Sequence, residues 1–239
     1  MQFPLHRCLL KISGELLGGA GKFGIDPDAV KKTAREIAGL KEALPDIQLS
    51  IVVGGGNFFR GASLKDETIS RLTADTMGML STIINALALQ DALKSSGVDC
   101  RTQTSFEIRP GVAEPFVRDR ALKHLEKGRV VVFAGGTGNP FFSTDTAAAL
   151  RASEIDAEAV LKGTKVDGIY DKDPVRNKDA VFFEKLRFEE ALEKKLGVMD
   201  ATAFALCMQQ RLPIIVFNAL REGSILKVIR GERIGTLVY

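Results

Sequence analysis

The feature that most constrains the fold is a regular alternation of short apolar runs with helical stretches along the whole chain. Runs of this length that are rich in β-branched residues are typical of buried strands. Strands that alternate with helices form a mostly parallel sheet with helices on both faces. We therefore predict an α/β fold, a three-layer α/β/α sandwich, in a single domain over residues 1–239. The predicted strands are 8–12, 47–53, 98–102, 129–134, 159–162, 213–218 and 236–239. The predicted helices are 26–43, 66–96, 114–127, one that starts at 144, 188–195, 201–210 and 224–230.

The overall charge argues against a broad nucleic-acid-binding surface. The chain has 33 basic and 30 acidic side chains, which gives a net charge of +3. This charge is too small for a protein that binds nucleic acid through a broad basic surface. No apolar run approaches the roughly 20 residues that a membrane-spanning helix needs, and the first residues lack a signal-peptide pattern. The three cysteines are scattered, without metal or disulfide spacing. We expect a cytoplasmic protein with reduced thiols and with no nucleic-acid or membrane partner.

Three of the predicted strands end in glycine, at 13–14, 54–56 and 135–136. In an open α/β sheet, ligands bind beyond the carboxyl ends of the strands. Glycine lets backbone N–H groups approach a ligand closely, and a following helix N-terminus adds partial positive charge. Any one of these glycines could simply relieve a tight turn. Three such loops at one edge of a sheet favour a phosphate-rich ligand.

Two common nucleotide-binding motifs are absent. The segment 16–23 ends in Gly-Lys-Phe, but Leu16 replaces the first glycine of a P-loop and Phe23 replaces its Ser/Thr. Neither 54–57 nor 136–139 continues to the third glycine of a dinucleotide-binding fingerprint. The two histidines have no neighbours typical of a metal site, and His124, in a charged helix, is expected to face solvent. The sequence therefore supports neither a nicotinamide enzyme nor a metalloenzyme.

Three charged residues next to the glycine loops are candidates for the chemistry. Lys11 ends an otherwise apolar strand, where a lysine is seldom buried without a partner. We expect it to point at a phosphate rather than to extend into solvent. Arg60 follows the second glycine loop by four residues; a lone arginine in a loop is usually a surface residue. Asp145 opens a predicted helix, where an N-cap role and a catalytic role are equally compatible with its position.

Taken together, the motifs resemble the amino acid kinase superfamily and, within it, the bacterial uridylate kinases. The similarity covers nearly the whole chain, and its strength lies in the ordered set rather than in the glycine triplet. The segments that carry it are 10–15, 52–61, 75–79, 136–145, 162–170, 173–174 and 198–200.

The resemblance implies an enzyme that transfers the γ-phosphate of ATP to UMP. Its catalytic residues would be Lys11, Arg60 and Asp145. The implied ATP site consists of Lys11, Ile12, Ser13, Gly14, Gly56, Arg60, Thr164, Tyr170 and Asp173. The implied UMP site consists of Gly55, Asp75, Thr137, Gly138, Asn139, Pro140, Phe141, Phe142, Ser143 and Thr144, with Asp75 accepting hydrogen bonds from the ribose hydroxyls. The segment associated with activation by GTP is Gly19, Ala20, Gly21, Lys22, Phe23 and Gly24.

The same resemblance implies Mg²⁺ bound through the ATP phosphates, inhibition by UTP, and a homohexamer. Lysine at position 22 is a modest departure from the family pattern, and the region 98–101 belongs to a part that varies among these enzymes. The acceptor phosphate has a second pKa of about 6 and is largely a dianion at neutral pH. It needs no general base, and we expect Asp145 to orient Lys11 or the metal shell.

Three alternatives remain at this stage. A kinase for a carboxylate, a carbamate or an isoprenoid phosphate could use the same scaffold. A regulatory or storage protein could keep the fold and bind a nucleotide or oxyanion without catalysis, because fold does not determine function. An NAD-dependent dehydrogenase is a more distant possibility.

Overall fold

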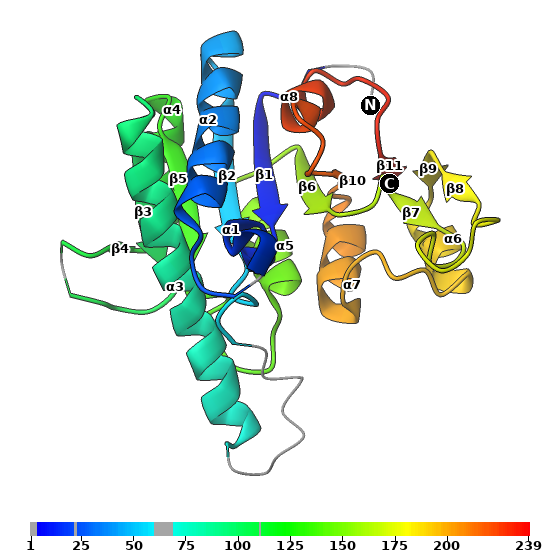
Figure 1. Ribbon diagram of the computed structural model, residues 1–239, viewed down its shortest axis with the longest axis horizontal. Coiled ribbons are helices and arrows are strands. Elements are labelled where there is room, and N and C mark those ends of the chain that lie inside the picture. The colour runs from blue at the N-terminus through cyan, green and yellow to red at the C-terminus, as the bar shows by residue number, and fades with distance from the viewer. Residues whose placement is uncertain (1–3, 22, 60–68, 110) are drawn as a thin grey trace.

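The computed structural model describes residues 4–21, 23–59, 69–109 and 111–239. The expectations that concern Lys22 and Arg60 lie outside these residues. Nine strands from both ends of the chain form one sheet in the order β4-β3-β5-β2-β1-β6-β10-β11-β9 (Figure 1). In sequence order they are β1 (Arg7–Ile12), β2 (Gln48–Val53), β3 (Cys100–Thr104), β4 (Glu114–Pro115), β5 (Val130–Ala134), β6 (Ala159–Thr164), β9 (Lys185–Leu186), β10 (Ile214–Asn218) and β11 (Thr236–Val238).

Every pairing in this sheet is parallel except that of β10 with β11. The carboxyl ends of β1, β2, β5, β6 and β10 therefore lie at one edge of the sheet. A separate antiparallel hairpin is formed by β7 (Ile169–Tyr170) and β8 (Phe182–Phe183). The predicted mostly parallel sheet is confirmed, whereas the short strands β4, β7, β8 and β9 were not predicted.

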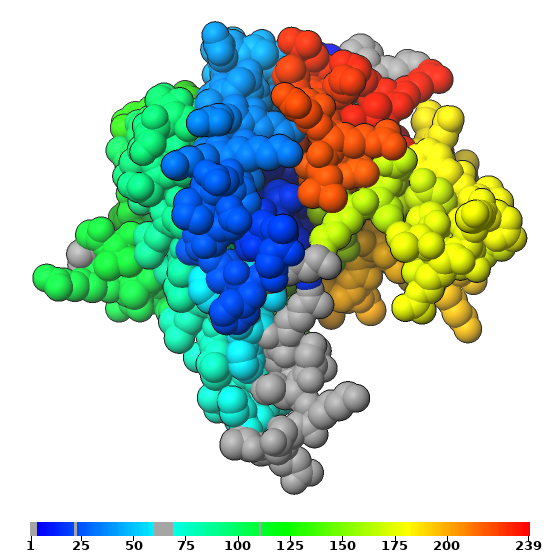
Figure 2. Space-filling model, viewed as in Figure 1, coloured from blue at the N-terminus to red at the C-terminus, as the bar shows by residue number. Residues whose placement is uncertain are grey.

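Helices cover both faces of the sheet and form the predicted three layers (Figure 1). Alternate residues of β1 divide between two apolar clusters: Leu10 packs with one set of helices and Leu9 with the other. The first set is α2 (Pro27–Ala43), α3 (Arg71–Ser95) and α8 (Ser224–Ile229). The second is α4 (Arg118–Glu126), α5 (Thr144–Glu154), α6 (Phe188–Glu193) and α7 (Ala201–Gln210). Figure 2 shows α2 and α8 next to each other over the first face.

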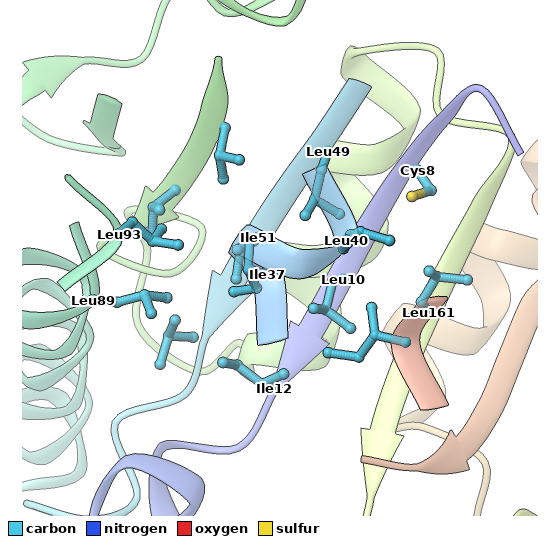
Figure 3. Close-up of a cluster of buried hydrophobic side chains, with 14 of the residues drawn as sticks. Cys8, Leu10, Ile12, Ile37, Leu40, Leu49, Ile51, Leu89, Leu93 and Leu161 are labelled. Atoms are coloured by element: carbon cyan, nitrogen blue, oxygen red, sulfur yellow. The ribbon is translucent and has the colours of Figure 1, made fainter. Parts of the chain in front are cut away.

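The core of the first face is a dense layer of aliphatic side chains (Figure 3). Ile37 and Leu40 of α2 and Leu89 and Leu93 of α3 are essentially inaccessible to water. They pack on Leu10, Ile12, Leu49, Ile51 and Leu161 of the strands. Burial of this apolar surface is the main stabilising term for the layer.

Local capping explains where two of the helices begin. The side chain of Asp26 accepts hydrogen bonds from the N–H groups of Asp28 and Ala29, and Pro27 takes the first helical position. The prediction that α2 begins at Asp26-Pro27 is confirmed. At α5 the cap is Ser143, whose hydroxyl accepts from the N–H groups of Asp145 and Thr146. The side chain of Asp145 is thus not the N-cap.

The predicted helix over 114–127 is wrong at its start. Glu114 and Pro115 form β4 at the edge of the sheet, and α4 begins only at Arg118. Proline disfavours helical geometry for the residue before it, and pairing with β3 occupies this segment instead. The expectation that His124 faces solvent is also wrong. His124 is buried, with Nε2 3.1 Å from a carboxylate oxygen of Glu114.

Two further expectations concern α3 and the cysteines. By length and composition α3 could cross a membrane, so the expectation that no such stretch exists is wrong. In this structure α3 packs on α2, β3 and β5 and buries the polar side chain of Asn85, as a core helix does. All three cysteines are free and buried, as expected. Burial raises the pKa of the Cys100 thiol to about 11.

Truncating Leu89 tests whether α3 is a core helix. Leu89→Ala is expected to lower the free energy of unfolding by about 2–5 kcal/mol, because the fully buried side chain leaves a cavity against the sheet. Leu192→Ala removes the same atoms from a side chain that is 52% exposed and should cost less than about 1 kcal/mol. Urea unfolding of both variants measures the difference. Equal losses would contradict the packing of α3 described above.

Candidate functional site

A cluster of three charged side chains lies where β1 and β6 end. Lys11 of β1 and Lys162 of β6 are register partners in adjacent parallel strands, so their side chains leave the same face of the sheet. Asp145 of α5 lies between them. Its Oδ1 is 2.8 Å from Nζ of Lys11, and its Oδ2 is 2.7 Å from Nζ of Lys162. The three side chains are only 13–16% exposed.

The two ammonium groups control the ionisation of Asp145. Burial by itself raises the pKa of this carboxyl, but the charges and hydrogen bonds of Lys11 and Lys162 outweigh burial. The pKa of Asp145 therefore lies below its ordinary value. A carboxylate that stays ionised cannot serve as an acid, and one paired with two cations is a weak base. Its geometry suits it to hold the lysines in place.

The loops after β1 and β2 pack so closely that Gly14 has no room for a side chain. A Cβ there would lie 2.4 Å from both the Asn57 side-chain oxygen and the Gly54 carbonyl. Asn57 and Asn85 exchange two hydrogen bonds, of 2.9 and 2.7 Å, and Asn85 also donates to the Gly54 carbonyl at 2.7 Å. These buried amides hold the two glycine loops against α3.

Gly55 lets α3 approach the second loop. A Cβ on Gly55 would lie 2.7 Å from the carbonyl oxygen of Gly78 in α3. The helix therefore lies directly beside the loop. Its N-terminal half extends beyond the carboxyl ends of the strands (Figure 1). This close approach brings Asp75 to the site.

Asp75 joins α3 to the 137–144 segment. Its Oδ2 accepts a 2.8 Å hydrogen bond from the backbone N–H of Phe141, and Nε of Arg71 lies 2.9 Å from both carboxylate oxygens. Phe141 has φ +70°, a conformation that is uncommon for a residue with a side chain. An ionised carboxylate offers about four acceptor positions, so Asp75 can still accept from a ligand.

The remainder of the 137–144 segment leads directly into the charged cluster. Gly138, at φ +84°, packs on Ser105 after β3. Ser143 caps α5 and donates its hydroxyl proton to Asp200, which also accepts from Thr146 at 3.0 Å. Asp200 in turn caps α7. This network ties the start of α5, and therefore Asp145, to the start of α7.

The residues expected at the adenosine end lie at and after the end of β6. Tyr170 packs edge-to-face on Phe182 and lines a cavity of about 370 Å³ that Asn218 and Lys227 also line. Thr164 donates its hydroxyl to the Val166 carbonyl at 2.7 Å. Asp173 is half-exposed in the turn after β7, where its side chain accepts from a backbone N–H two residues on.

The segment expected to mediate activation lies against the second glycine loop. Residues Gly19–Gly21 form a short 3₁₀ turn, and Gly24 exchanges two hydrogen bonds with Asn57, of 2.8 and 2.6 Å. Phe23 is 77% exposed and packs edge-to-face on Phe58. The segment is thus connected to the two glycine loops through Asn57.

Sequence reasoning did not assign Lys162, Asp200 or Asn85. Lys162 carried the same signal as Lys11, a lysine at the end of an apolar strand, and Lys162 and Asp200 both lay inside motifs already noted. Asn85 could be found only through its buried contacts. Among the described residues, no group of three or more His, Cys, Asp and Glu side chains is placed to hold a metal ion.

Comparison with known proteins fits this geometry. Residues 6–218 match the amino acid kinase family. The chain belongs to the amino acid kinase family. The crystal structure of UMP kinase from Bacillus anthracis is 37% identical, with a TM-score of 0.93, and the match covers 98% of this chain and 96% of that one.

Two further structures extend the comparison. That of UMP kinase from Ureaplasma parvum is 36% identical with a TM-score of 0.90, over 100% of this chain and 99% of that one. Uridylate kinase from Archaeoglobus fulgidus is 26% identical with a TM-score of 0.72, over 97% and 99%. The family resemblance indicated by the motifs and the fold class predicted from the alternation of strands and helices are confirmed.

The lowered pKa of Asp145 predicts acid sensitivity of this member of the amino acid kinase family. A carboxyl whose pKa is lower in the folded than in the unfolded protein stabilises the fold above its ordinary pKa, and the effect is lost as pH falls through the folded-state value. The difference in unfolding free energy between the wild type and Asp145→Asn should therefore be constant above about pH 4 and shrink below it. Urea unfolding from about pH 6 to about pH 3 measures it. A difference that does not change with pH would contradict the ion pairs.

Proposed function

We propose that this protein is a UMP kinase that transfers the γ-phosphate of Mg·ATP to UMP, giving ADP and UDP. The observation that carries the proposal is the continuity of the site. The segment that contacts Asp75 runs directly into α5, where Asp145 holds two lysines at the carboxyl edge of the sheet. An acceptor-binding part and a phosphate-binding part are thus adjacent. The full-length similarity to two UMP kinases supports uridylate as the acceptor.

The chemistry requires positioning rather than a base. A dianionic oxygen of the UMP phosphate attacks the γ-phosphorus, the bond to the bridging β-phosphate oxygen breaks, and ADP leaves with that oxygen. Phosphoryl transfer is catalysed mainly by alignment and by stabilisation of charge. Lys11 and the backbone N–H groups of the glycine loops supply fixed positive charge beside the reacting phosphates. Mg²⁺ arrives as part of the Mg·ATP substrate.

The residue roles follow the order of the loops. The ATP phosphates would contact Lys11, Ser13, Gly14 and Gly56, with Arg60, which lies outside the described residues, also assigned to them. The cavity beside Tyr170 would receive the adenosine end. UMP would bind between Asp75 and the 137–144 segment.

Assembly, regulation and location are further parts of the proposal. The apolar side chains of Met77, Leu80 and Ile84 are 36–47% exposed on α3. Their spacing puts them on one face of the helix, which supports burial between copies in a homohexamer. The hydrogen bonds between Gly24 and Asn57 support an effect of GTP on the phosphate loops. We also propose inhibition by UTP, a role in pyrimidine nucleotide biosynthesis, a cytoplasmic location and a single functional domain.

A coupled assay of ADP formation from Mg·ATP tests the reaction, with UMP, CMP, dUMP, glutamate and carbamate as acceptors in parallel. Turnover with UMP alone is the expected result. Turnover with another acceptor would keep the phosphate site but overturn the uridylate assignment. Binding of ATP and UMP without turnover would instead favour a non-catalytic nucleotide-binding protein.

Lys11→Ala tests the phosphate assignment. Removing this ammonium should lower kcat by on the order of a hundredfold to a thousandfold, the range seen when one preorganised charge-stabilising group is lost. The variant should keep the wild-type circular dichroism spectrum, because the side chain is at the edge of the core. Steady-state kinetics at saturating ATP and UMP measure the change. Near-normal turnover would remove Lys11 from the mechanism.

Asp75→Ala tests the acceptor site. The KM for UMP should rise about tenfold to a hundredfold, the value of one or two hydrogen bonds to a charged group, while the KM for ATP changes little. Asp173→Ala serves as the matched control, a carboxylate assigned to the adenosine end, and should affect the KM for ATP instead. The opposite pattern in the two variants would mean that the nucleotide sites are exchanged.

A further inference from the structure

Lys11 and Lys162 place two like charges side by side near the carboxyl end of the sheet. The row of register partners that contains them is Val52, Lys11, Lys162 and Val216, on β2, β1, β6 and β10. Both flanking valines are buried in the core of the α5 face. Two ammonium groups side by side in such surroundings repel each other and are costly to desolvate. They require an anion between them.

Asp145 is that anion, and it is shared between the two lysines. Each carboxylate oxygen faces a different ammonium group, at 2.8 and 2.7 Å. The three groups together therefore carry two positive charges and one negative charge, a net charge of +1. If Lys11 were paired with Asp145 alone, that pair would be neutral and its field at a phosphate would be weak.

Lys162 is held in place from its other side as well. Its Nζ donates a 2.6 Å hydrogen bond to the carbonyl of Val198, a residue that is 1% exposed. The same stretch of chain continues to Asp200, which caps α7 and accepts from Ser143 at the start of α5. The ammonium group of Lys162 is thus fixed between α5 and the start of α7 and does not move to solvent.

We propose that Lys162 is a positioning residue that, by sharing Asp145 with Lys11, leaves the charge of Lys11 available to the transferring phosphoryl group. The expected effect on kcat rests on the proposed function. The charge balance of the cluster, in contrast, should affect the binding of any polyphosphate at this edge of the sheet. The effect of Lys162 acts through Asp145 and Lys11 rather than through contact with substrate.

The test compares Lys162→Met, Asp145→Asn and the double variant. Lys162→Met leaves Lys11 paired with Asp145, a neutral site, and kcat should fall on the order of a hundredfold. The double variant Lys162→Met/Asp145→Asn restores a single positive charge on Lys11, so kcat should recover about tenfold from the level of Lys162→Met, the size of coupling found between residues in contact. If Lys162 had a merely structural role, the double variant would be no more active than Lys162→Met.

Two controls separate charge from folding. Lys162→Gln keeps a side-chain N–H donor for the Val198 carbonyl but removes the charge, and it should lose activity as Lys162→Met does. Lys41→Met removes a lysine that donates to backbone carbonyls at the other end of the sheet, those of Pro45 and Ile47. This control should keep wild-type kcat. Thermal unfolding of every variant reports whether it folds; if Lys162→Met does not fold, Lys162→Gln decides the question.

Calorimetric titration with inorganic tripolyphosphate provides a readout that does not depend on UMP. The affinity of the protein for tripolyphosphate should be lower in Lys162→Met than in the wild type and higher again in the double variant. The three proteins could rank in affinity for tripolyphosphate as expected while the wild type forms no ADP with UMP. That result would overturn the proposed function and keep the inference. If the wild type is active, a Lys162→Gln variant of unchanged kcat, or a double variant no more active than Lys162→Met, would overturn the inference.

Discussion

The arrangement of the candidate site depends on the ion cluster of Lys11, Asp145 and Lys162. Two lysines near the ends of adjacent parallel strands lie beside buried valines and are only 13% and 16% exposed, which is unfavourable unless a carboxylate lies between them. The requirement for that carboxylate places the first turn of α5 over β1 and β6, and it places the residues before α5 at the same edge. The ion pairs of Asp145 thus join strands β1 and β6 to α5 and to the 137–144 segment that leads into it.

Close backbone approach supplies the second constraint. Gly14 lies against Asn57 and Gly54, and Gly55 lies against Gly78 of α3 at distances that leave no room for a Cβ. These contacts place the phosphate loops and α3 in a single packed unit. Buried hydrogen bonds between Asn57 and Asn85 then fix their relative position, since an unpaired buried amide would be costly.

These two constraints account for the division of the site. In the proposed site the charged cluster would bind phosphates, whereas Asp75 of α3 and the 137–144 segment that it contacts would bind the acceptor. The only described histidine that is buried, His124, lies with Glu114 at the β4 edge. The arrangement thus favours transfer between two phosphates, which depends on alignment and positive charge, over reactions that need a histidine base.

Local sequence pattern determined the layered fold, the parallel sheet and the start of α2, because apolar periodicity and capping are properties of neighbouring residues. It also identified Lys11 and Asp145 as charged residues in unusual positions. It did not determine that residues 114–117 leave the helix, since β4 exists only through pairing with β3. Nor did it assign Asp200 or Asn85, because their partners lie 57 and 28 residues away along the chain. Lys162 carries the same signal as Lys11, but only the fold shows that both lysines face Asp145. Only the tertiary structure brought those partners together and placed one carboxylate between two lysines, which leaves the cluster with a net positive charge.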